Sequence, residues 1–280
     1  MTLVNAIRLT GVKILKALLS PIEFRGKRSI LSALCPHQGE INIHLFGYSF
    51  TCDLSELIQR NIFLFNYDED AQLFVRKRLH PGDTFVDAGA NVGFYTLLAA
   101  SIVGERGKVI AIEPNPKPFL KLKRVIEKNN ITNVILLNVA LGKEPGTCNL
   151  FLNPEYGCDT ATMVAHDAPE SILVEVQPLD SVVATHQIER IDYLKVDVEG
   201  FEPDVLAGAK KLLSERRIGV IQCEFCEFWL ERNSSSPERL HRFLIESGFT
   251  DADGPPQFAK NCIVERFFIS TKDDAAKISA

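Results

Sequence analysis

A glycine-containing turn between an apolar strand and an apolar helix constrains this chain more than any other feature of its sequence. Residues 84–86 form a short apolar run that predicts a buried strand, and Asp87 closes it. Gly89 and Gly93 follow, where a tight turn and a close approach of the backbone to a ligand require residues without a side chain. The helix after the turn offers free N–H groups at its start. This order of strand, turn and helix builds a nucleotide-shaped pocket.

A second strand ends in an acid beside the same pocket. Residues 109–112 predict this strand, and Glu113 follows it, 20 residues after Gly93. A carboxylate at this position can accept hydrogen bonds from ribose hydroxyl groups. We therefore expect Glu113 to bind a cofactor rather than to act in catalysis. The turn alone is also compatible with some other α/β protein, and the spacing of Glu113 favours the cofactor site.

The residues of the turn favour a cofactor that carries a cationic group. A dinucleotide site has the pattern G-x-G-x-x-G, and the first glycine of that triplet is missing from AGANVG at 88–93. Asp87, just upstream, would repel a pyrophosphate and attract an ammonium group. The pattern D-x-G-x-N-x-G therefore suits a ligand with an ammonium group, a sulfonium and a ribose. The candidate cofactor-binding residues of this segment are Asp87, Gly89, Ala90, Asn91 and Gly93.

Several segments together carry a resemblance to a known family. The pattern D-x-G-x-N-x-G resembles motif I of class I S-adenosylmethionine-dependent methyltransferases. The later segments NVALG at 138–142, PLD at 178–180 and DYLKVDVEGFE at 192–202 resemble the FkbM family of these enzymes in order and spacing. The resemblance covers about residues 80–265, and K-x-D-x-E-G-x-E is its most specific piece. It implies S-adenosylmethionine as cofactor and methyl transfer, in many members to a hydroxyl of a sugar or natural product.

Two acids and a lysine surround the end of a further predicted strand, at 193–196. Asp197 and Glu199 follow this strand, on the edge where open α/β sheets bind ligands, so a carboxylate there could take the proton of an acceptor hydroxyl. Lys195 precedes Asp197 by two residues, so both side chains point to one face of an extended strand and can pair. We rank Asp197 first, Glu199 second and Lys195 third as catalytic residues. The alternative role of these acids is to cap the next helix or to fix the loop by a salt bridge.

Two other strand ends carry candidate binding residues. Asn138 follows the strand expected at 134–137, and its amide group could contact the adenine edge of the cofactor. Glu224 follows the strand expected at 218–223. Together with the aromatic residues after it, Glu224 could line the acceptor pocket, although such aromatics more often belong to a core. The aromatic residues concerned are Phe225, Phe228 and Trp229.

The alternation of strand and helix patterns predicts an α/β protein with a mostly parallel sheet that helices cover on both faces. The resemblance implies that this is the Rossmann-like class I methyltransferase fold, with seven strands, preceded by an N-terminal α+β extension. A polar loop at 153–170, between strands expected at 147–152 and 173–176, is a candidate lid. The expected parts are an extension at 1–80 (amphipathic helix at 1–20, then a loop, a β-pair near 41–52 and a helix near 69–79), a methyltransferase domain at 81–270 and a flexible tail at 271–280. Within the domain, residues 203–213 are expected to form one helix.

The composition of the chain limits the classes of partner that it is expected to bind. The net charge is −5 with acids and bases interspersed, which does not favour a nucleic-acid partner. Seven cysteines in a chain of 280 residues fit reduced thiols and a cytoplasmic protein. Cys223 and Cys226 form a C-x-x-C pattern within an apolar run, and no second pair or nearby histidine completes a metal site, so we expect no metal. The expected partner is a small hydroxylated acceptor.

The first 20 residues predict an amphipathic helix. Apolar residues share one arc of this helix and Lys13 and Lys16 lie on the other side. The segment is too interrupted by polar residues to span a bilayer. It can pack on the catalytic domain or on a partner subunit, which includes a homo-oligomer, or it can lie on a membrane surface.

Two other functions remain open at this point. A nicotinamide-dependent oxidoreductase shares the broad fold, but the missing glycine and Asp87 count against it. A non-catalytic binding or scaffold protein could retain the fold for stability. The intact pattern of Asp87, Gly89, Gly93 and Glu113 counts against that alternative, because an unused pocket has no need of an acid that binds ribose.

Overall fold

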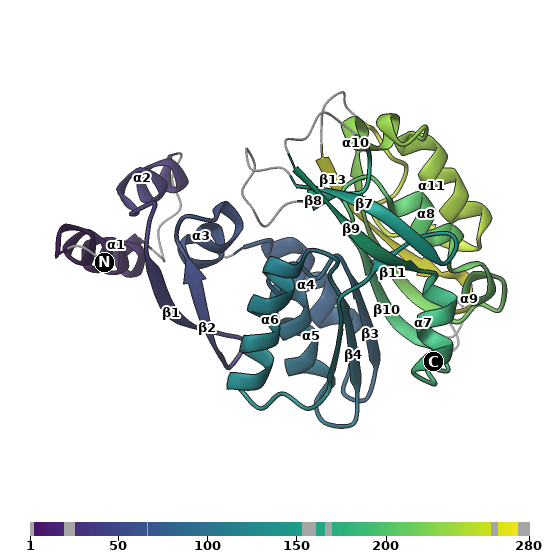
Figure 1. Ribbon diagram of the computed structural model, residues 1–280, viewed down its shortest axis with the longest axis horizontal. Coiled ribbons are helices and arrows are strands. Elements are labelled where there is room, and N and C mark those ends of the chain that lie inside the picture. The colour runs from purple at the N-terminus through teal and green to yellow at the C-terminus, as the bar shows by residue number, and fades with distance from the viewer. Residues whose placement is uncertain are drawn as a thin grey trace. The chain divides into compact units, whose positions relative to one another are not determined.

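The computed structural model describes residues 3–19, 26–65, 67–152, 161–165, 170–258 and 263–273 (Figure 1). The chain divides into two compact units, Met1–Leu73 and Phe74–Ala280. The helix α4 (Glu69–Arg78) crosses the boundary between them.

The first unit contains helices and one β-hairpin. The predicted β-pair is present as β1 (Glu40–Leu45) and β2 (Tyr48–Asp53), which pair antiparallel. The segment before it was expected to be a loop, and that prediction is wrong: it contains α2 (Lys27–Leu34), which buries Leu31 at 1% exposure. The other helices of this unit are α1 (Leu3–Leu19) and α3 (Leu57–Leu64). Across the described residues, no helix is long and apolar enough to cross a bilayer.

The second unit is built on a seven-stranded sheet within the described residues. Its strand order is β12-β13-β11-β10-β3-β4-β5, and the neighbours from β11 to β5 are all parallel. β13 runs antiparallel to both of its neighbours. The predicted class I methyltransferase fold is confirmed. The strands are β3 (Thr84–Ala88), β4 (Lys108–Ile112), β5 (Val134–Leu137), β10 (Ile191–Val196), β11 (Ile218–Cys226), β12 (Phe249–Asp251) and β13 (Ile263–Ser270).

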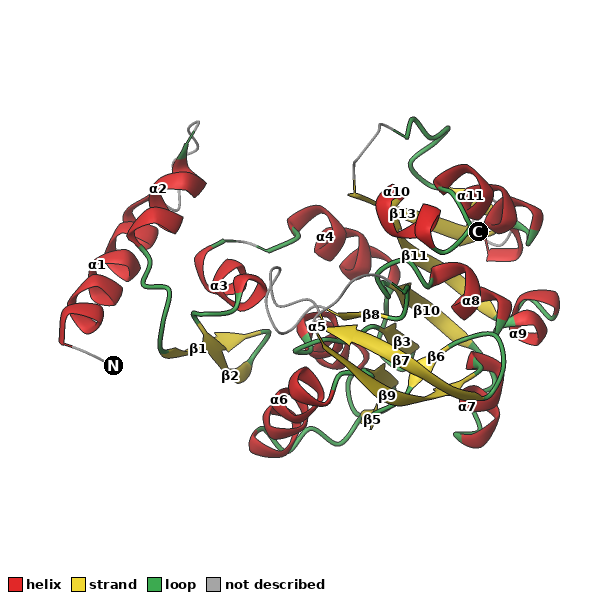
Figure 2. Ribbon diagram, turned by 45° about the horizontal axis from the view of Figure 1, so that its top comes forward, coloured by secondary structure: helices red, strands yellow, loops and turns green. Residues whose placement is uncertain are grey.

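Helices cover both faces of this sheet because strand side chains alternate between the faces (Figure 2). On one face, Val86, Ile110 and Leu194 join a large core together with α7, α8, α9 and α11. On the other, Ala111 packs with Leu122 of α6. The helices of this unit are α5 (Phe94–Val103), α6 (Pro116–Lys128), α7 (Leu179–Thr185), α8 (Glu202–Ala207), α9 (Lys210–Ser214), α10 (Glu227–Arg232) and α11 (Pro237–Glu246).

A second, smaller sheet has the order β6-β9-β7-β8. It confirms the strands expected on either side of the polar loop. Of the candidate lid at 153–170, the structure describes only residues 161–165 and 170, and the rest lies outside the described residues. One face of the sheet packs with Met163 and the partly buried Phe201. Its strands are β6 (Ala140–Leu141), β7 (Gly146–Leu152), β8 (Ala161–Thr162) and β9 (Glu170–Gln177).

Three boundaries differ from the sequence-based expectation. The helix expected at 203–213 is two helices, α8 and α9, because the Asp180 carboxylate accepts hydrogen bonds from the N–H groups of Lys211 and Leu212 and starts a new helix there. β11 continues past residue 223, so Glu224 lies within the strand rather than after it. The short edge strand β12 was not expected, because three residues carry no recognisable period.

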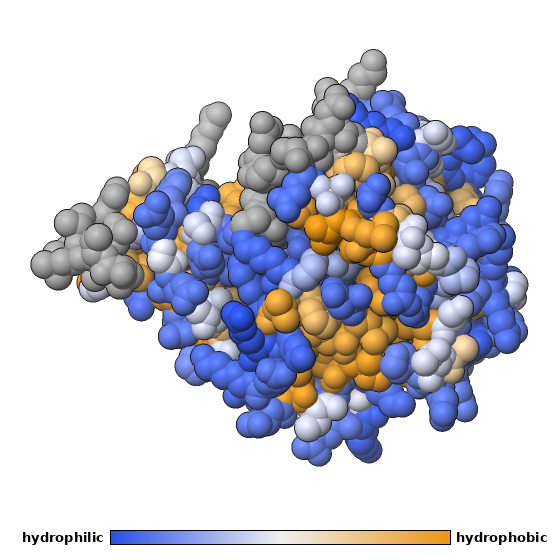
Figure 3. Space-filling model, viewed as in Figure 1, coloured by the Kyte–Doolittle hydropathy of each residue, from blue (hydrophilic) through white to orange (hydrophobic). Residues whose placement is uncertain are grey.

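The second unit leaves apolar surface on the side shown in Figure 3, where an orange area occupies the part of the view between α6 and α7. β5 is an edge strand of the large sheet, and each of its four apolar residues is partly exposed. Short edge strands limit unwanted pairing with other chains.

Candidate active site

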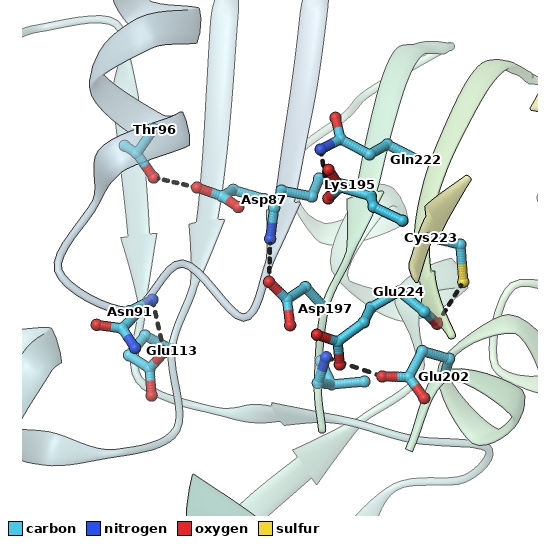
Figure 4. A network of polar contacts seen from close by, with 12 residues as sticks. Asp87, Asn91, Thr96, Glu113, Lys195, Asp197, Glu202, Gln222, Cys223 and Glu224 are labelled. Carbon is cyan, nitrogen blue, oxygen red and sulfur yellow. Dashed lines mark hydrogen bonds and ion pairs between the residues drawn. The ribbon is translucent and has the colours of Figure 1, made fainter. Parts of the chain in front are cut away.

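The predicted site residues lie at the carboxyl ends of four adjacent strands, β10, β3, β4 and β5. β10 lies beside β3, with Lys195 in register with Asp87. β4 lies on the other side of β3, with Ile112 in register with Ala88. The turn after β3, Glu113 after β4, and Asp197 after β10 therefore share one edge of the sheet (Figure 4). This is the edge where open parallel sheets bind their ligands.

Gly89 lies against the backbone of Asp197. Its φ angle is +84°, and a Cβ atom at this position would be 1.8 Å from the Asp197 carbonyl oxygen. The Asp197 N–H in turn donates to the Ala88 carbonyl at 3.0 Å. The turn after β3 and the loop after β10 are therefore in direct backbone contact, and glycine is the residue that permits this contact.

Glu113 holds the turn in place. One oxygen of its carboxylate accepts a hydrogen bond from the Asn91 N–H, and the other accepts from the Asn115 N–H, both at 2.7 Å. Glu113 is 6% exposed. Asn91 has a φ of 50°, a left-handed conformation that asparagine tolerates better than most residues. Glu113 thus fixes the turn after β3, and its contact with ribose stays a prediction.

Asp87 is turned into the interior rather than towards solvent. It is fully buried, and its Oδ2 accepts a hydrogen bond from the Thr96 hydroxyl at 2.6 Å (Figure 4). Burial raises the pKa of its carboxyl, while the nearby Lys195 ammonium opposes that rise. The cation beside Asp87 in the structure is therefore Lys195, and a direct contact with an ammonium group of the cofactor stays a prediction.

Asn138, Ala90 and Gly93 complete the predicted cofactor set. Asn138 is exposed and its Nδ2 donates to the carbonyls of Glu113 and Pro114, so the orientation of its amide group is fixed beside the end of β4. Ala90 is buried, and its N–H donates to the Ile112 carbonyl. Gly93 immediately precedes α5 with a φ of 91°. The adenine contact of Asn138 stays a prediction.

Lys195 and Asp197 form an ion pair at the end of β10. The Lys195 Nζ lies 2.6 Å from the Asp197 Oδ2. The Lys195 side chain is 4% exposed, whereas that of Asp197 is 34% exposed. Burial alone would lower the pKa of Lys195, but the charges of Asp197, Asp87 and Glu265 outweigh it and raise the pKa above its ordinary value. A buried cation therefore orients the partly exposed carboxylate of Asp197.

The loop after Asp197 is held by several hydrogen bonds. Glu202, at the start of α8, accepts from the N–H groups of Val198 and Gly200, both at 3.1 Å. The Asn233 side chain donates to the Gly200 carbonyl. Glu199 has a φ of 53°. Glu202 thus fixes the loop before α8 through hydrogen bonds to the loop's own N–H groups, and among the described residues no side-chain hydrogen bond caps the helix.

Three glutamates at this edge have raised pKa values. Burial, followed by the charges of Asp197 and Glu202, raises the pKa of Glu199 to about 8. Burial raises the pKa of Glu202 to about 7, although its backbone hydrogen bonds oppose the rise. Burial and the charge of Asp197 raise the pKa of Glu224 well above its usual range. Carboxylates with raised pKa values are stronger bases than free ones.

Sequence reasoning missed the residues that hydrogen-bond to the predicted site residues and hold them in place. Thr96, which bonds to Asp87, and Thr162, whose hydroxyl donates to the Glu199 carbonyl at 2.6 Å, come from distant parts of the chain. Trp229 was considered as acceptor lining, and its side chain instead hydrogen-bonds to Glu199. No periodicity or spacing pairs such residues before the fold brings them together. Cys223 and Cys226 lie buried on β11 as free thiols.

The residues at this edge fit S-adenosylmethionine. Gly89 keeps the turn free of side chains, and Glu113 presents a carboxylate at the end of β4. In the described part of the chain, the buried Asp87 Oδ1 has no hydrogen-bond partner. When bound, this cofactor supplies a methyl group on a cationic sulfur. Residues 87–93 together with Glu113 and Asn138 would hold it.

Comparison with known proteins agrees with this geometry. "Methyltransferase 1" of Beauveria bassiana is 30% identical over 149 residues, which are 46% of this chain and 59% of that protein. "31-O-demethyl-FK506 methyltransferase FkbM" of Streptomyces tacrolimicus is 27% identical over 161 residues, which are 47% of this chain and 61% of that protein. The chain therefore spans about three fifths of the length of these relatives.

A solved FkbM methyltransferase from Methylobacillus flagellatus aligns with a TM-score of 0.46 at 15% identity, over 76% of this chain and 59% of that one. The family described as "Methyltransferase FkbM domain" matches residues 87–250, which is more than half of the chain and contains every residue of the site described above. The chain belongs to the FkbM methyltransferase domain family of S-adenosylmethionine-dependent enzymes.

Proposed function

We propose that this protein transfers the methyl group of S-adenosylmethionine to a hydroxyl of a small acceptor such as a sugar, a glycolipid head group or a natural product. The observation that carries the proposal is the contact of Gly89 with Asp197. It joins the proposed cofactor turn to a partly exposed carboxylate that the buried Lys195 ammonium orients. A methyl donor and a hydroxyl acceptor need this proximity, because alignment of the reacting groups supplies much of the rate.

In this proposal the acids at the end of β10 have different chemical roles. The Lys195–Asp197 pair orients the acceptor hydroxyl, because Asp197 is fixed by its ion pair and is one-third exposed. Glu199 accepts the proton, because a carboxylate with a pKa of about 8 is a better base near neutral pH than an ordinary one. Asp197 remains the alternative proton acceptor.

The proposal that the acceptor is a hydroxyl is supported by the family and by one relative. The name of the Streptomyces relative, 31-O-demethyl-FK506 methyltransferase, refers to an oxygen position. This supports oxygen rather than nitrogen as the methyl acceptor here. The carboxylates of Asp197, Glu199 and Glu224 surround the same edge and give no matching site for a nucleic-acid phosphate.

The first test is calorimetric titration with S-adenosylhomocysteine, with NAD as comparison. We expect S-adenosylhomocysteine to bind and NAD not to bind. The second is formation of S-adenosylhomocysteine from S-adenosylmethionine with a panel of monosaccharides, glycolipids and polyketides. Asp197→Asn should lower turnover on any accepted compound and spare cofactor affinity, and Asp70→Asn, at an exposed helical site, should change neither. Binding of NAD instead would favour an oxidoreductase, and binding of neither ligand would favour a scaffold.

The first unit carries a separate proposal of peripheral membrane contact. On α1, Ile14 and Leu18 are 57% and 65% exposed, and Lys13 is exposed as well. This combination suits an anionic bilayer surface. The double substitution Ile14→Glu and Leu18→Glu should release the protein from phosphatidylserine liposomes in a pelleting assay. A wild-type protein that never pellets, but elutes as a dimer that the same substitutions dissociate, would assign these residues to a homo-oligomer.

A further inference from the structure

The loop that carries Glu199 has an unusual backbone. Glu199 and Gly200 are both in the left-handed region, with φ values of 53° and 94°. Glycine adopts this conformation readily, and a residue such as glutamate rarely does. At Gly200, a Cβ atom would be 2.4 Å from the Trp229 Cβ, so the loop passes close to α10. Some neighbouring group must therefore hold Glu199 in its conformation.

A threonine from the small sheet supplies such a group. The Thr162 hydroxyl donates to the Glu199 carbonyl oxygen at 2.6 Å, and its oxygen accepts from the Val164 N–H at 3.0 Å. Thr162 is 2% exposed. In a buried environment both partners of the Thr162–Glu199 bond need it, because an unpaired polar group there is costly. The bond spans 37 positions of sequence, from β8 to the end of β10.

The position of Thr162 does not depend on this hydroxyl. Its backbone pairs with Phe151 of β7. Met163 belongs to the core of the small sheet, and Val164 packs with Cys226 and Trp229. Loss of the hydroxyl would therefore leave β8 in place. The Glu199 carbonyl and the Val164 N–H would each lose a hydrogen bond to that hydroxyl.

We propose that Thr162 is a positioning residue, which holds Glu199 in the left-handed conformation and so aims its carboxylate at the acceptor edge beside Asp197. The inference rests on the proposed methyl transfer for its functional meaning. It deepens that proposal by assigning part of the catalytic geometry to the small sheet. The small sheet then holds the loop after β10 in its conformation.

Trp229 offers a direct readout of this geometry. It is the only tryptophan of the chain, and its side chain hydrogen-bonds to the Glu199 carboxylate. The charges that act on Glu199 come from Asp197, Glu202 and Lys195 on the same loop and strand, and the charge of Glu199 in turn helps to raise the pKa of Glu224 on β11. Ionisation of Glu199, whose pKa is about 8, should therefore change the tryptophan emission.

The experiment is a pH titration of tryptophan fluorescence between pH 5 and pH 10. The wild type should show a transition near pH 8 that is absent from Glu199→Gln. In Thr162→Val, which keeps the shape and removes the hydroxyl, the transition should move down by about one pH unit or more, because Glu199 leaves the neighbouring acids. Thr162→Ser should restore the wild-type transition. Thr147→Val, at an exposed position of β7, is the matched control and should titrate as wild type.

The inference is overturned if Thr162→Val titrates as wild type, or if Glu199→Gln retains the transition. Near-UV circular dichroism checks that each variant is folded, and Thr162→Ala, which also removes the hydroxyl and should titrate as Thr162→Val does, keeps the test decisive if Thr162→Val is unfolded. Calorimetry with S-adenosylhomocysteine on the same proteins separates the two proposals. Absence of binding to the wild type would end the methyltransferase proposal, whereas the fluorescence titration would still decide the role of Thr162.

Discussion

Gly89 and Asp197 are in such close backbone contact that no other residue fits at position 89. A Cβ atom there would lie 1.8 Å from the carbonyl oxygen of Asp197 and 2.9 Å from its carbonyl carbon. The obstacle is backbone, which cannot rotate away as a flexible side chain can. The turn after β3 and the loop after β10 are thus coupled through one glycine.

Gly89→Ala should abolish binding of S-adenosylhomocysteine and lower the free energy of unfolding by about 2 kcal/mol or more, from left-handed strain and the collision together. Calorimetry and urea denaturation measure the two effects. The matched control is Gly82→Ala, because Gly82 has a similar φ of +95° and no atom within 4 Å of an added Cβ. It should show the strain alone, with normal cofactor affinity. Equal affinity losses in both variants would contradict the proposed coupling.

Glu113→Gln should weaken S-adenosylhomocysteine binding by about tenfold or more, because a charge-assisted hydrogen bond contributes roughly 1.5–3 kcal/mol. Glutamine keeps one oxygen that can accept from Asn91 or Asn115, so the turn should survive. Glu105→Gln, at an exposed position before β4, should bind like the wild type. Unchanged affinity of Glu113→Gln would limit Glu113 to shaping the turn.

The rate of methyl transfer should rise with pH to a plateau above a midpoint near pH 8. Glu199 must be ionised to accept a proton, and burial raises its pKa to about 8. Glu199→Gln should remove this dependence and lower kcat by about 100-fold or more, the usual contribution of a general base. The pH profile of kcat is the measurement. A profile that remains in Glu199→Gln but disappears in Asp197→Asn would make Asp197 the base.

The stability of the protein should fall as the pH rises from about 5 to about 8. Glu202 is fully buried, and burial raises its pKa to about 7 from an ordinary value of 4.5. Protonated Glu202 contributes fully to the free energy of unfolding below its unfolded-state pKa. This contribution is lost as the pH rises through its folded-state pKa. The loss for this one group is on the order of 3 kcal/mol.

Glu202→Gln isolates that contribution. Its free energy of unfolding in urea should depend less on pH between 5 and 8 than that of the wild type. All other titrating groups are common to the two proteins, so the difference between the curves belongs to Glu202 and the acids it influences. Parallel curves would show that the Glu202 pKa is not raised in the folded state.

Local patterns in the sequence were sufficient to predict the large sheet and the turn. Residues 84–86 and 109–112 are continuous apolar runs, as buried parallel strands require, and the glycines of the turn fall between them. The same reasoning failed to predict α2. Burial of Leu31 stabilises this helix, and that burial depends on tertiary packing rather than on a local pattern. The same reasoning also failed for the break between α8 and α9, because Asp180 reaches that break from another part of the chain.

The sequence by itself determined the fold class, the cofactor turn and the identity of the acids at the strand ends, because these follow from spacing along one strand, one turn or one helix. The tertiary structure decided what each of those groups faces. It turned Asp87 towards Thr96 and Lys195, engaged Glu113 with the N–H groups of the turn, and placed Thr162 on the carbonyl of Glu199. Such contacts join residues that are far apart in the chain, so they depend on how the layers pack and leave no local pattern.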